Sequence, residues 1–312
     1  MTEPAPTQDK NLLFIKNTFI NPEEKRLRSG WRLSINLFLL LIFSIIIGIP
    51  AMLISLLIPS LTDISLIVTN GIPIILAVLI SRLWIDRKSL GSLGLSLSLR
   101  SLLDVVVGAG IAVLQLALVF GIEYAMGWLT LDGFGWEQDG LQPTLGGLLL
   151  WLLLFAAVGF YEELFSRGYQ FQNLEEGLNT FWAVLLSAGF FGFLHITNPG
   201  ASLGSTLGIF LAGLYFAFAY LRTRSLWLAI GIHFGWNFTL GPVLGFPVSG
   251  MKTAHILVQE VTGPELWTGG VFGPEAGLVV VPALILGVIL ISLYTQGRKP
   301  QQPVTQKQIE LQ

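Results

Sequence analysis

Long apolar runs separated by short polar connections dominate the chain from residue 33 onward. A run of about 20 apolar residues is long enough to cross the hydrocarbon core of a bilayer as a helix. Eight segments approach or exceed this length: Leu33–Leu57, Ser65–Trp84, Leu102–Glu123, Leu145–Phe171, Phe181–Thr197, Leu203–Tyr220, Leu226–Leu244 and Leu278–Tyr294. The pattern therefore predicts an all-α, polytopic membrane protein with about eight transmembrane helices.

Polar segments flank this apolar region. We expect residues 1–30 to form a polar N-terminal tail, residues 31–296 the transmembrane domain, and residues 297–312 a disordered tail rich in Gln and Pro. The first apolar run begins too late and runs too long for a cleaved signal peptide. We therefore expect it to be the first membrane span.

The basic residues predict the orientation of these spans. With eight helices both termini lie on one side, and every Lys and Arg except Lys252 falls on that side. The connection after the third helix carries Asp132, Glu137 and Asp139 and no basic residue. Because short cytoplasmic loops are enriched in Lys and Arg, we expect both termini to be cytoplasmic, in a bacterial plasma membrane.

Composition narrows the possible functions. The chain is 53% hydrophobic and 12% charged, with a mean hydropathy of +0.72, values typical of a membrane protein. A net charge of −2 without a basic cluster argues against a nucleic-acid partner. The absence of cysteine excludes disulfides, thiolate metal ligands and a cysteine nucleophile.

Very few ionisable residues fall well inside the predicted spans. They are Glu162, Glu163 and Arg167 in the fourth helix, His195 in the fifth and His233 in the seventh. Exposing such a group to lipid costs at least ~2.5 kcal/mol, so these residues usually face a bundle interior or a water-filled cavity. We expect them to lie near one another at overlapping depths in the membrane.

The spacing of these residues separates the two glutamates. Glu163 and Arg167 are four residues apart and share a helix face, so we expect an ion pair that supports helix packing. Glu162 is rotated by about 100° from Glu163 and has no such local partner. In the seventh helix, His233 and Asn237 are also four residues apart and share a face.

This set of residues permits hydrolysis of a peptide bond. A buried carboxylate beside an imidazole can remove a proton from water as the water attacks a carbonyl carbon. A His and an Asn one turn apart can supply N–H donors to the oxyanion. A serine triad fits less well, because no G-x-S-x-G occurs and Ser166 has no adjacent histidine. Two His with one or two Glu could instead hold zinc, although H-E-x-x-H is absent.

Three motifs resemble those of one known family. "EELFSR" (residues 162–167) matches E-E-x-x-x-R, "FGFLH" (191–195) matches F-x-x-x-H, and "HFGWN" (233–237) matches H-x-x-x-N. In this order they are similar to the CPBP family of intramembrane proteases, which includes type II CAAX prenyl endopeptidases and bacteriocin-immunity (Abi) proteins. The resemblance covers residues 145–245, and "GPEAGL" (273–278) resembles a phrase near the last helix of bacterial members.

The resemblance implies a role for each motif residue. It implies a glutamate-dependent endopeptidase with its catalytic core on the fourth, fifth and seventh helices. Glu162 and His195 would activate water, His233 and Asn237 would form the oxyanion site, and Glu163 and Arg167 would support them. The expected substrate is a peptide or protein near the cytoplasmic leaflet, and the family includes enzymes that act on prenylated tails.

Three alternatives remain open. No cofactor is expected, but zinc at the Glu and His residues is the alternative for the same protease. A non-catalytic, immunity-type membrane protein could use the polar cluster only for packing. A transporter is disfavoured, because the sequence shows no pair of matching halves with broken helices.

Overall fold

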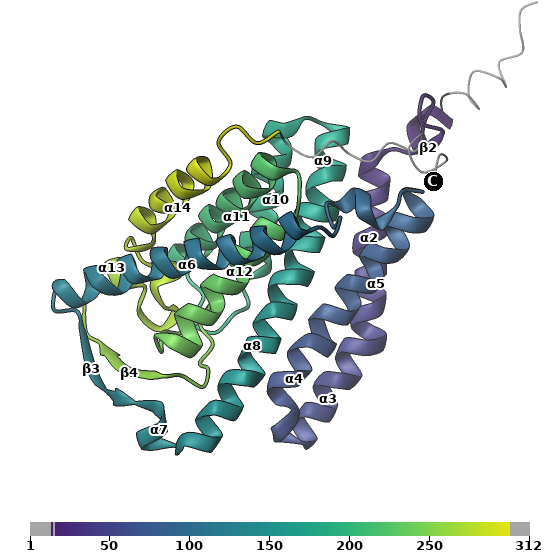
Figure 1. Cartoon of the computed structure of the whole chain (residues 1–312). Coiled ribbons are helices and arrows are strands. Elements are labelled where there is room, and N and C mark those ends of the chain that lie inside the picture. The colour runs from purple at the N-terminus through teal and green to yellow at the C-terminus, as the bar shows by residue number, and fades with distance from the viewer. Residues whose placement is uncertain (1–13, 15, 300–312) are drawn as a thin grey trace, which may run out of the picture.

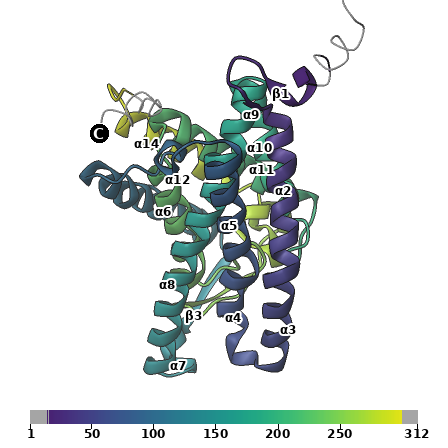
Figure 2. The same cartoon turned by 90° about the vertical axis from the view of Figure 1, so that its right-hand side faces the viewer.

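The computed structural model describes residue 14 and residues 16–299, and Figures 1 and 2 show it as an all-α bundle. Each of the eight predicted apolar segments contains helix. The main helices are α2 (Ser29–Phe43), α3 (Ile49–Leu57), α5 (Ile72–Ile80), α6 (Leu99–Ala125), α8 (Leu141–Glu163), α9 (Phe171–Gly177), α10 (Thr180–Leu194), α11 (Leu203–Thr223), α12 (Trp227–Phe238) and α14 (Val280–Tyr294). Short helices are α4 (Thr62–Leu66), α7 (Gly135–Gln138) and α13 (Glu265–Thr268), with 3₁₀ turns at Pro59–Leu61, Leu90–Leu93, Gly270–Phe272 and Pro274–Ala276.

Several helices continue through π-helical turns into longer rods. A π-helical turn at Ser44–Gly48 joins α2 to α3, and one at Leu164–Gln170 joins α8 to α9. Similar turns lie at Ile67–Gly71 and Ser81–Ile85 on either side of α5, and at Thr239–Val243 after α12. π-Helical turns inside α-helices are frequent at functional sites. The turn after α8 begins directly after Glu163.

Five helical rods within the described residues are long and apolar enough to cross a membrane, judged by length and composition. They are Ser29–Leu57, Ile67–Ile85, Leu99–Ala125, Leu141–Gly177 and Leu203–Thr223. The other three predicted spans correspond to the shorter helices α10, α12 and α14. The protein is therefore a polytopic integral membrane protein, and the number of eight spans stays a prediction.

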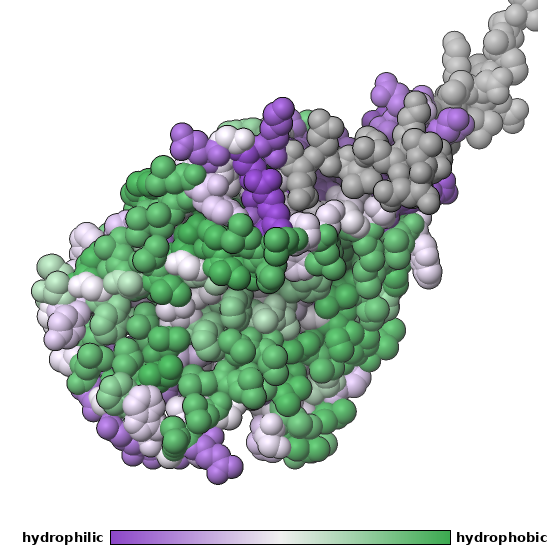
Figure 3. Space-filling model, viewed as in Figure 1, coloured by the Kyte–Doolittle hydropathy of each residue, from purple (hydrophilic) through white to green (hydrophobic). Residues whose placement is uncertain are grey.

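The helix α8 lies between two groups of helices (Figure 1). On one side are α2, α3, α4 and α5, and on the other are α6, α10, α11, α12 and α14. Apolar side chains cover most of the face shown in Figure 3. Large apolar side chains on α2, α6 and α8, such as Phe38, Leu103 and Leu149, are exposed. Such a surface is expected where helices contact lipid.

Glycines bring α12 unusually close to its neighbours. A Cβ on Gly231 would lie 2.4 Å from the Val105 carbonyl oxygen of α6, and one on Gly235 would lie 2.5 Å from the Ala109 Cα. Gly231 and Gly235 form a G-x-x-x-G pattern, which lets helix backbones approach closely in membranes. His233 lies between these glycines in the sequence. The tight α6–α12 contact therefore fixes the height of His233 in the bundle.

Two small antiparallel sheets lie in the connections. Strand β1 (Ile20–Asn21) pairs with β2 (Arg26–Leu27), and β3 (Leu129–Phe134) pairs with β4 (Leu257–Val261) with a register shift between Leu131 and Gly133. The first hairpin lies within the expected polar N-terminal tail. Arg298, within the expected disordered tail, bonds Asp104 through both Nη atoms. Residues 1–13 and 300–312 of the two tails lie outside the described residues.

An ion-pair network joins the start of α2 to the residues after α5 and to α9. Asp86 is held by Arg32 at 3.3 Å and by Arg82 at 3.0 Å. Glu176 is held by Arg26, Arg32 and Lys88. We call these six residues the Asp86–Glu176 network. Because the network gathers several basic residues at one end of the bundle, it agrees with the charge asymmetry, while the cytoplasmic orientation stays a prediction.

Candidate active site

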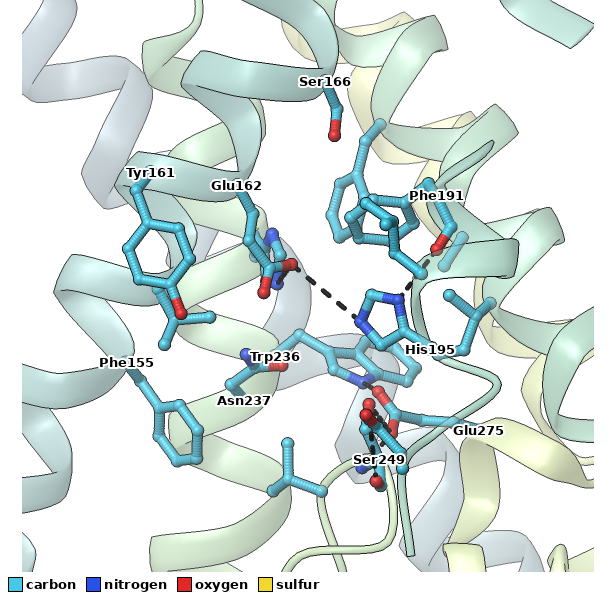
Figure 4. Close-up of a pocket in the computed structure, with 18 of the residues that line it drawn as sticks. Phe155, Tyr161, Glu162, Ser166, Phe191, His195, Trp236, Asn237, Ser249 and Glu275 are labelled. Carbon is cyan, nitrogen blue, oxygen red and sulfur yellow. Dashed lines mark hydrogen bonds and ion pairs between the residues drawn. The ribbon is translucent and has the colours of Figure 1, made fainter. Parts of the chain in front are cut away.

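The carboxylate of Glu162 lies between two imidazole rings that come from different helices (Figure 4). Its Oε2 atom is 4.0 Å from Nε2 of His195 and 3.8 Å from Nε2 of His233. Glu162 lies near the end of α8 and His233 lies on α12. His195 follows directly after α10, which ends at Leu194 and not at Thr197 as predicted. The fold thus brings three of the sequence-predicted site residues together.

Hydrogen bonds at Nδ1 orient both imidazole rings. Nδ1 of His195 lies 2.8 Å from the carbonyl oxygen of Phe191, the first residue of the F-x-x-x-H motif. Nδ1 of His233 lies 3.0 Å from Oε1 of Glu163. Because a carbonyl or carboxylate oxygen can only accept, each Nδ1 carries the proton and each neutral ring presents an unprotonated Nε2 to Glu162. The site therefore concentrates hydrogen-bond acceptors around Glu162.

The expected Glu163–Arg167 ion pair is present and lies behind the imidazoles. Nη1 of Arg167 is 3.0 Å from Oε1 of Glu163, and Nη2 donates to the Gly213 carbonyl of α11 at 2.8 Å. Both side chains are fully buried. The guanidinium also lies 4.5 Å from the ring centroid of Phe191 and 5.1 Å from that of Phe216. Glu163 therefore connects Arg167 to His233, a contact that the sequence spacing did not predict.

Aromatic rings hold the two histidines in place. Phe216 stacks on the His233 ring with centroids 4.8 Å apart, and Phe191 lies 4.8 Å from the His195 ring. Both phenylalanines also contact the Arg167 guanidinium. Such packing leaves each imidazole little rotational freedom. The arrangement of the two rings therefore also depends on Phe216, which no sequence motif marked.

Asn237 lies one helical turn after His233 and lines the same cavity. Its side chain is largely buried, and no hydrogen bond joins its amide to another described residue. Figure 4 shows Asn237 on the same side of the cavity as Tyr161 and below Glu162. An amide group in this position has N–H donors available for a ligand.

The cavity around Glu162 has a volume of about 440 Å³ and reaches both sides of α8. Leu40, Ser44, Asn70 and Ile74 line it from the side of α2 and α5, while α11 and α14 line it opposite. Its walls are mainly apolar, with polar groups concentrated around Glu162. A cavity of this size with a few convergent polar groups is typical of a ligand or active site.

Comparisons with known proteins find similarity over the part of the chain that holds these residues. Residues 144–239 match a family described as "Type II CAAX prenyl endopeptidase Rce1-like". The matched range contains Glu162, His195, His233 and Asn237. Over this range the chain is similar to the Rce1-like family.

One curated protein that is similar to this chain also carries a peptidase name. It is "Putative membrane peptidase YdiL" of Bacillus subtilis (strain 168), which is 30% identical over 176 residues. The match covers 55% of this chain and 66% of the relative, slightly less than two thirds of its length. Both comparisons thus relate part of the chain to peptidases, one described as a CAAX prenyl endopeptidase and one named a putative membrane peptidase.

A second buried carboxylate, Glu275, lines the cavity and was given no role from the sequence. Its Oε1 accepts from Trp236 Nε1 at 3.0 Å, and its Oε2 accepts from the backbone N–H and the hydroxyl of Ser249 at 2.6 and 3.0 Å. Burial raises the pKa of the Glu275 carboxyl, and the Ser249 hydrogen bonds oppose that shift because they stabilise the charged form. The phrase "GPEAGL" contains Glu275 and was the one available signal.

The structure also bears on the metal and serine alternatives. Among the described residues, no group of three or more His, Cys, Asp or Glu side chains is arranged to hold a metal ion. The 3.8 and 4.0 Å separations at Glu162 also exceed the roughly 3.3 Å between ligand atoms of a tetrahedral zinc site. Ser166 lines the cavity, but no hydrogen bond joins its hydroxyl to a histidine within the described residues.

Proposed function

We propose that this protein is an intramembrane endopeptidase in which Glu162 and His195 activate a water molecule for attack on a peptide carbonyl. One observation carries the proposal. Oε2 of Glu162 is buried, has no hydrogen-bond partner among the described residues, and faces Nε2 of two imidazoles from other elements. Both oxygens of Glu123 and Oε2 of Glu163 also lack a partner, so the position of Oε2 of Glu162 between two imidazole nitrogens, rather than the missing partner alone, distinguishes this carboxylate. An unsatisfied acceptor between two further acceptors suits a ligand that donates two hydrogen bonds, such as water.

The distances fit a shared water. Two acceptors that each bind one water at about 2.8 Å lie about 4–4.5 Å apart when the angle at the water is near tetrahedral. Oε2 of Glu162 and Nε2 of His195 are 4.0 Å apart. As the water oxygen attacks the carbonyl carbon, its proton passes to Glu162 or His195, and that proton can then reach the leaving amide nitrogen. One pair of residues thus serves as base and then as acid.

Asn237 and His233 are proposed to stabilise the oxyanion. The Asn237 amide can donate directly, because no described residue engages it. His233 uses Nδ1–H for Glu163, so only the doubly protonated ring has an N–H at Nε2 to offer. The Glu163 carboxylate accepts from Nδ1 in both protonation states and keeps Nε2 directed into the cavity. Removing one such donor typically lowers kcat by about 10²–10³-fold.

Similarity to peptidases supports a peptide as the substrate. The matched family is described as an endopeptidase, and the Bacillus subtilis relative is named a membrane peptidase. The apolar walls of the cavity suit a substrate that enters from, or lies against, the bilayer. We propose a bond near the cytoplasmic leaflet, in agreement with the expected orientation. The non-catalytic, immunity-type function remains the alternative that the experiment must exclude.

The test is cleavage of a quenched peptide library by purified protein in liposomes. We expect the Glu162→Gln variant to lose about 10²–10⁴-fold in kcat/KM, because the amide cannot accept the proton. Glu260→Gln, the same change at an exposed strand residue, is the matched control and should retain full activity. Thermal unfolding of each variant verifies that it is folded.

A chelator arm tests the zinc alternative in the same assay. We expect wild-type cleavage to continue in the presence of a strong zinc chelator. If the chelator abolished cleavage and added zinc restored it, the metal-free mechanism with Glu162 and His195 would be wrong. The zinc-dependent mechanism would then take its place. Full cleavage by folded Glu162→Gln, or no cleavage by wild type with any peptide, would overturn the endopeptidase proposal.

A further inference from the structure

His195 lies outside regular secondary structure and needs support from other segments. It follows directly after α10, and the two residues after it are exposed. His233, by contrast, lies inside α12 and is held by Glu163 and Phe216. A residue in a turn at the surface is held less firmly than one inside a packed helix. A fixed place for His195 beside Glu162 therefore requires further contacts.

Asn198 connects His195 to the loop that follows α12. Its backbone N–H donates to the His195 carbonyl oxygen at 3.1 Å, and its side-chain Nδ2 donates to the Ser249 carbonyl oxygen at 3.2 Å. Next to Ser249, a Cβ on Gly250 would collide with the Pro199 carbonyl oxygen. The turn at His195 and the loop at Ser249 are therefore packed against each other and joined by a hydrogen bond.

Ser249 is in turn held by Glu275. The backbone of Ser249 has φ 47°, in the left-handed region. This conformation costs about 1–3 kcal/mol in a residue other than glycine and persists only where surrounding contacts hold it. The backbone N–H and the hydroxyl of Ser249 both donate to Oε2 of Glu275, at 2.6 and 3.0 Å. Glu275 therefore stabilises the loop that holds the turn at His195.

The other oxygen of Glu275 holds the helix that carries Asn237. Oε1 accepts from Nε1 of Trp236 at 3.0 Å, and Trp236 directly precedes Asn237 in α12. Figure 4 shows Trp236 and Ser249 next to Glu275, below the His195 ring. The indole and backbone N–H groups can only donate, so the carboxyl group must present an acceptor on each side. A protonated carboxyl group keeps acceptor capacity, so these contacts do not require a net charge on Glu275.

The backbone of Glu275 is fixed against α11. A Cβ on Gly208 would collide with the Glu275 carbonyl oxygen, and one on Gly204 would lie 3.1 Å from the Ala276 carbonyl oxygen. Both glycines lie on α11, and the missing side chains allow the loop backbone to approach the helix this closely. The Glu275 side chain therefore extends from a closely packed base.

We propose that Glu275 is a positioning residue, which joins the turn at His195 to α12 and so fixes His195 and Asn237 in their places around Glu162. The proposal rests on the endopeptidase function proposed above. A displacement of about 1 Å in a catalytic group can lower the rate about 10²-fold. Loss of the connection should therefore lower kcat, whereas peptide binding to the cavity walls should change little.

The experiment measures kcat and KM for a library peptide that the wild-type protein cleaves. We expect Glu275→Gln to lower kcat by about 10–100-fold and to leave KM within about threefold of the wild-type value. Glu260→Gln should leave both constants unchanged. Wild-type kcat in folded Glu275→Gln, or a higher KM with unchanged kcat, would overturn the positioning role. Either result would leave the endopeptidase proposal standing, because the wild-type protein cleaves in the same assay.

A second substitution tests the hydrogen bond between Glu275 and Trp236. The amide of Glu275→Gln has one acceptor oxygen, so its NH2 group must face either the Trp236 or the Ser249 donor. Trp236→Phe removes the indole N–H and with it this conflict. We therefore expect the loss of kcat caused by Glu275→Gln to be about fivefold smaller in the Trp236→Phe protein than in the wild type. An equal loss in both proteins would rule out this connection.

Ser249→Ala provides a milder test that decides the question even where Glu275→Gln does not fold. It removes the hydroxyl donor and keeps the backbone N–H donor to Glu275. We expect kcat to fall about three- to tenfold, the usual effect of one hydrogen bond, with KM unchanged. An unchanged kcat would contradict the proposal.

Discussion

Two clusters of buried charges in this protein are built in opposite ways. In the Asp86–Glu176 network each carboxylate is held by at least two cationic side chains, as Asp86 is by Arg32 and Arg82. In the cavity, Glu162 and Glu275 contact histidines or neutral donors, and neither forms an ion pair with a lysine or arginine among the described residues, although Arg167 acts on Glu162 from a greater distance. Glu163 lies between these cases, because Arg167 neutralises it while His233 connects it to the cavity.

The difference separates a structural use of charge from a chemical one. Buried ions cost several kcal/mol to desolvate, and paired geometry with full hydrogen bonding is what offsets that cost. The network meets the pairing condition, although Nη1 of Arg26 and Nε of Arg32 have no hydrogen-bond partner among the described residues. It ties α2 to α9 and to the residues after α5. Glu162 does not meet it, so its charge must be retained for another reason. Replacing a carboxylate by its amide should therefore lower the stability of the protein in the network, whereas at Glu162 it should abolish cleavage without lowering stability.

The largest effect is expected in the network. Asp86→Asn leaves the guanidinium groups of Arg32 and Arg82 buried without their carboxylate. We expect the free energy of unfolding to fall by about 3–5 kcal/mol, the usual cost of breaking a buried pair by removing one partner. Denaturant unfolding in detergent measures it, with Asp139→Asn at an exposed position as the control. A loss below about 1 kcal/mol would show that the network is not a structural clamp.

The two adjacent glutamates should respond with opposite signs. Glu163→Gln removes the partner of Arg167, and we expect a loss of about 2–3 kcal/mol in unfolding free energy. Glu162→Gln removes a charge without a cationic partner, so stability should stay the same or rise by up to about 1 kcal/mol while cleavage is lost. Unfolding and peptide cleavage are measured on the same preparations. Equal destabilisation by both substitutions would contradict the distinction.

The smallest effect is expected at the rim of the network. The Lys88 side chain is 38% exposed and lies 3.1 Å from Glu176. Burial lowers the pKa of its ammonium group more than Glu176 raises it, so below that pKa the charged form adds no net stability. Lys88→Met should therefore change the unfolding free energy by less than about 0.5 kcal/mol. A loss comparable to that of Asp86→Asn would place Lys88 among the essential members of the network.

Much of the fold could be predicted from the sequence. Features that depend on residues close together in the chain were predictable, and contacts between distant segments were not. Each of the eight apolar runs contains helix in the described part of the chain, because a helix satisfies its own backbone hydrogen bonds in lipid. The number of spans stays a prediction. The end of α10 was placed too late, at Thr197, because the sequence around His195 remains compatible with helix. The Glu163–Arg167 pair was predictable because both residues lie on one helix face.

The sequence by itself determined what each segment can do locally: its length in the bilayer, the residues that share a face, and the few costly ionisable groups that need partners. Tertiary structure decided which partners they found on other segments of the chain. Close packing at Gly231 and Gly235 sets the position of His233, which then binds Glu163, and the loop after α13 brings Glu275 to Trp236 and Ser249. Helical periodicity follows from covalent geometry over a few residues, whereas contacts between distant segments depend on how whole surfaces fit together.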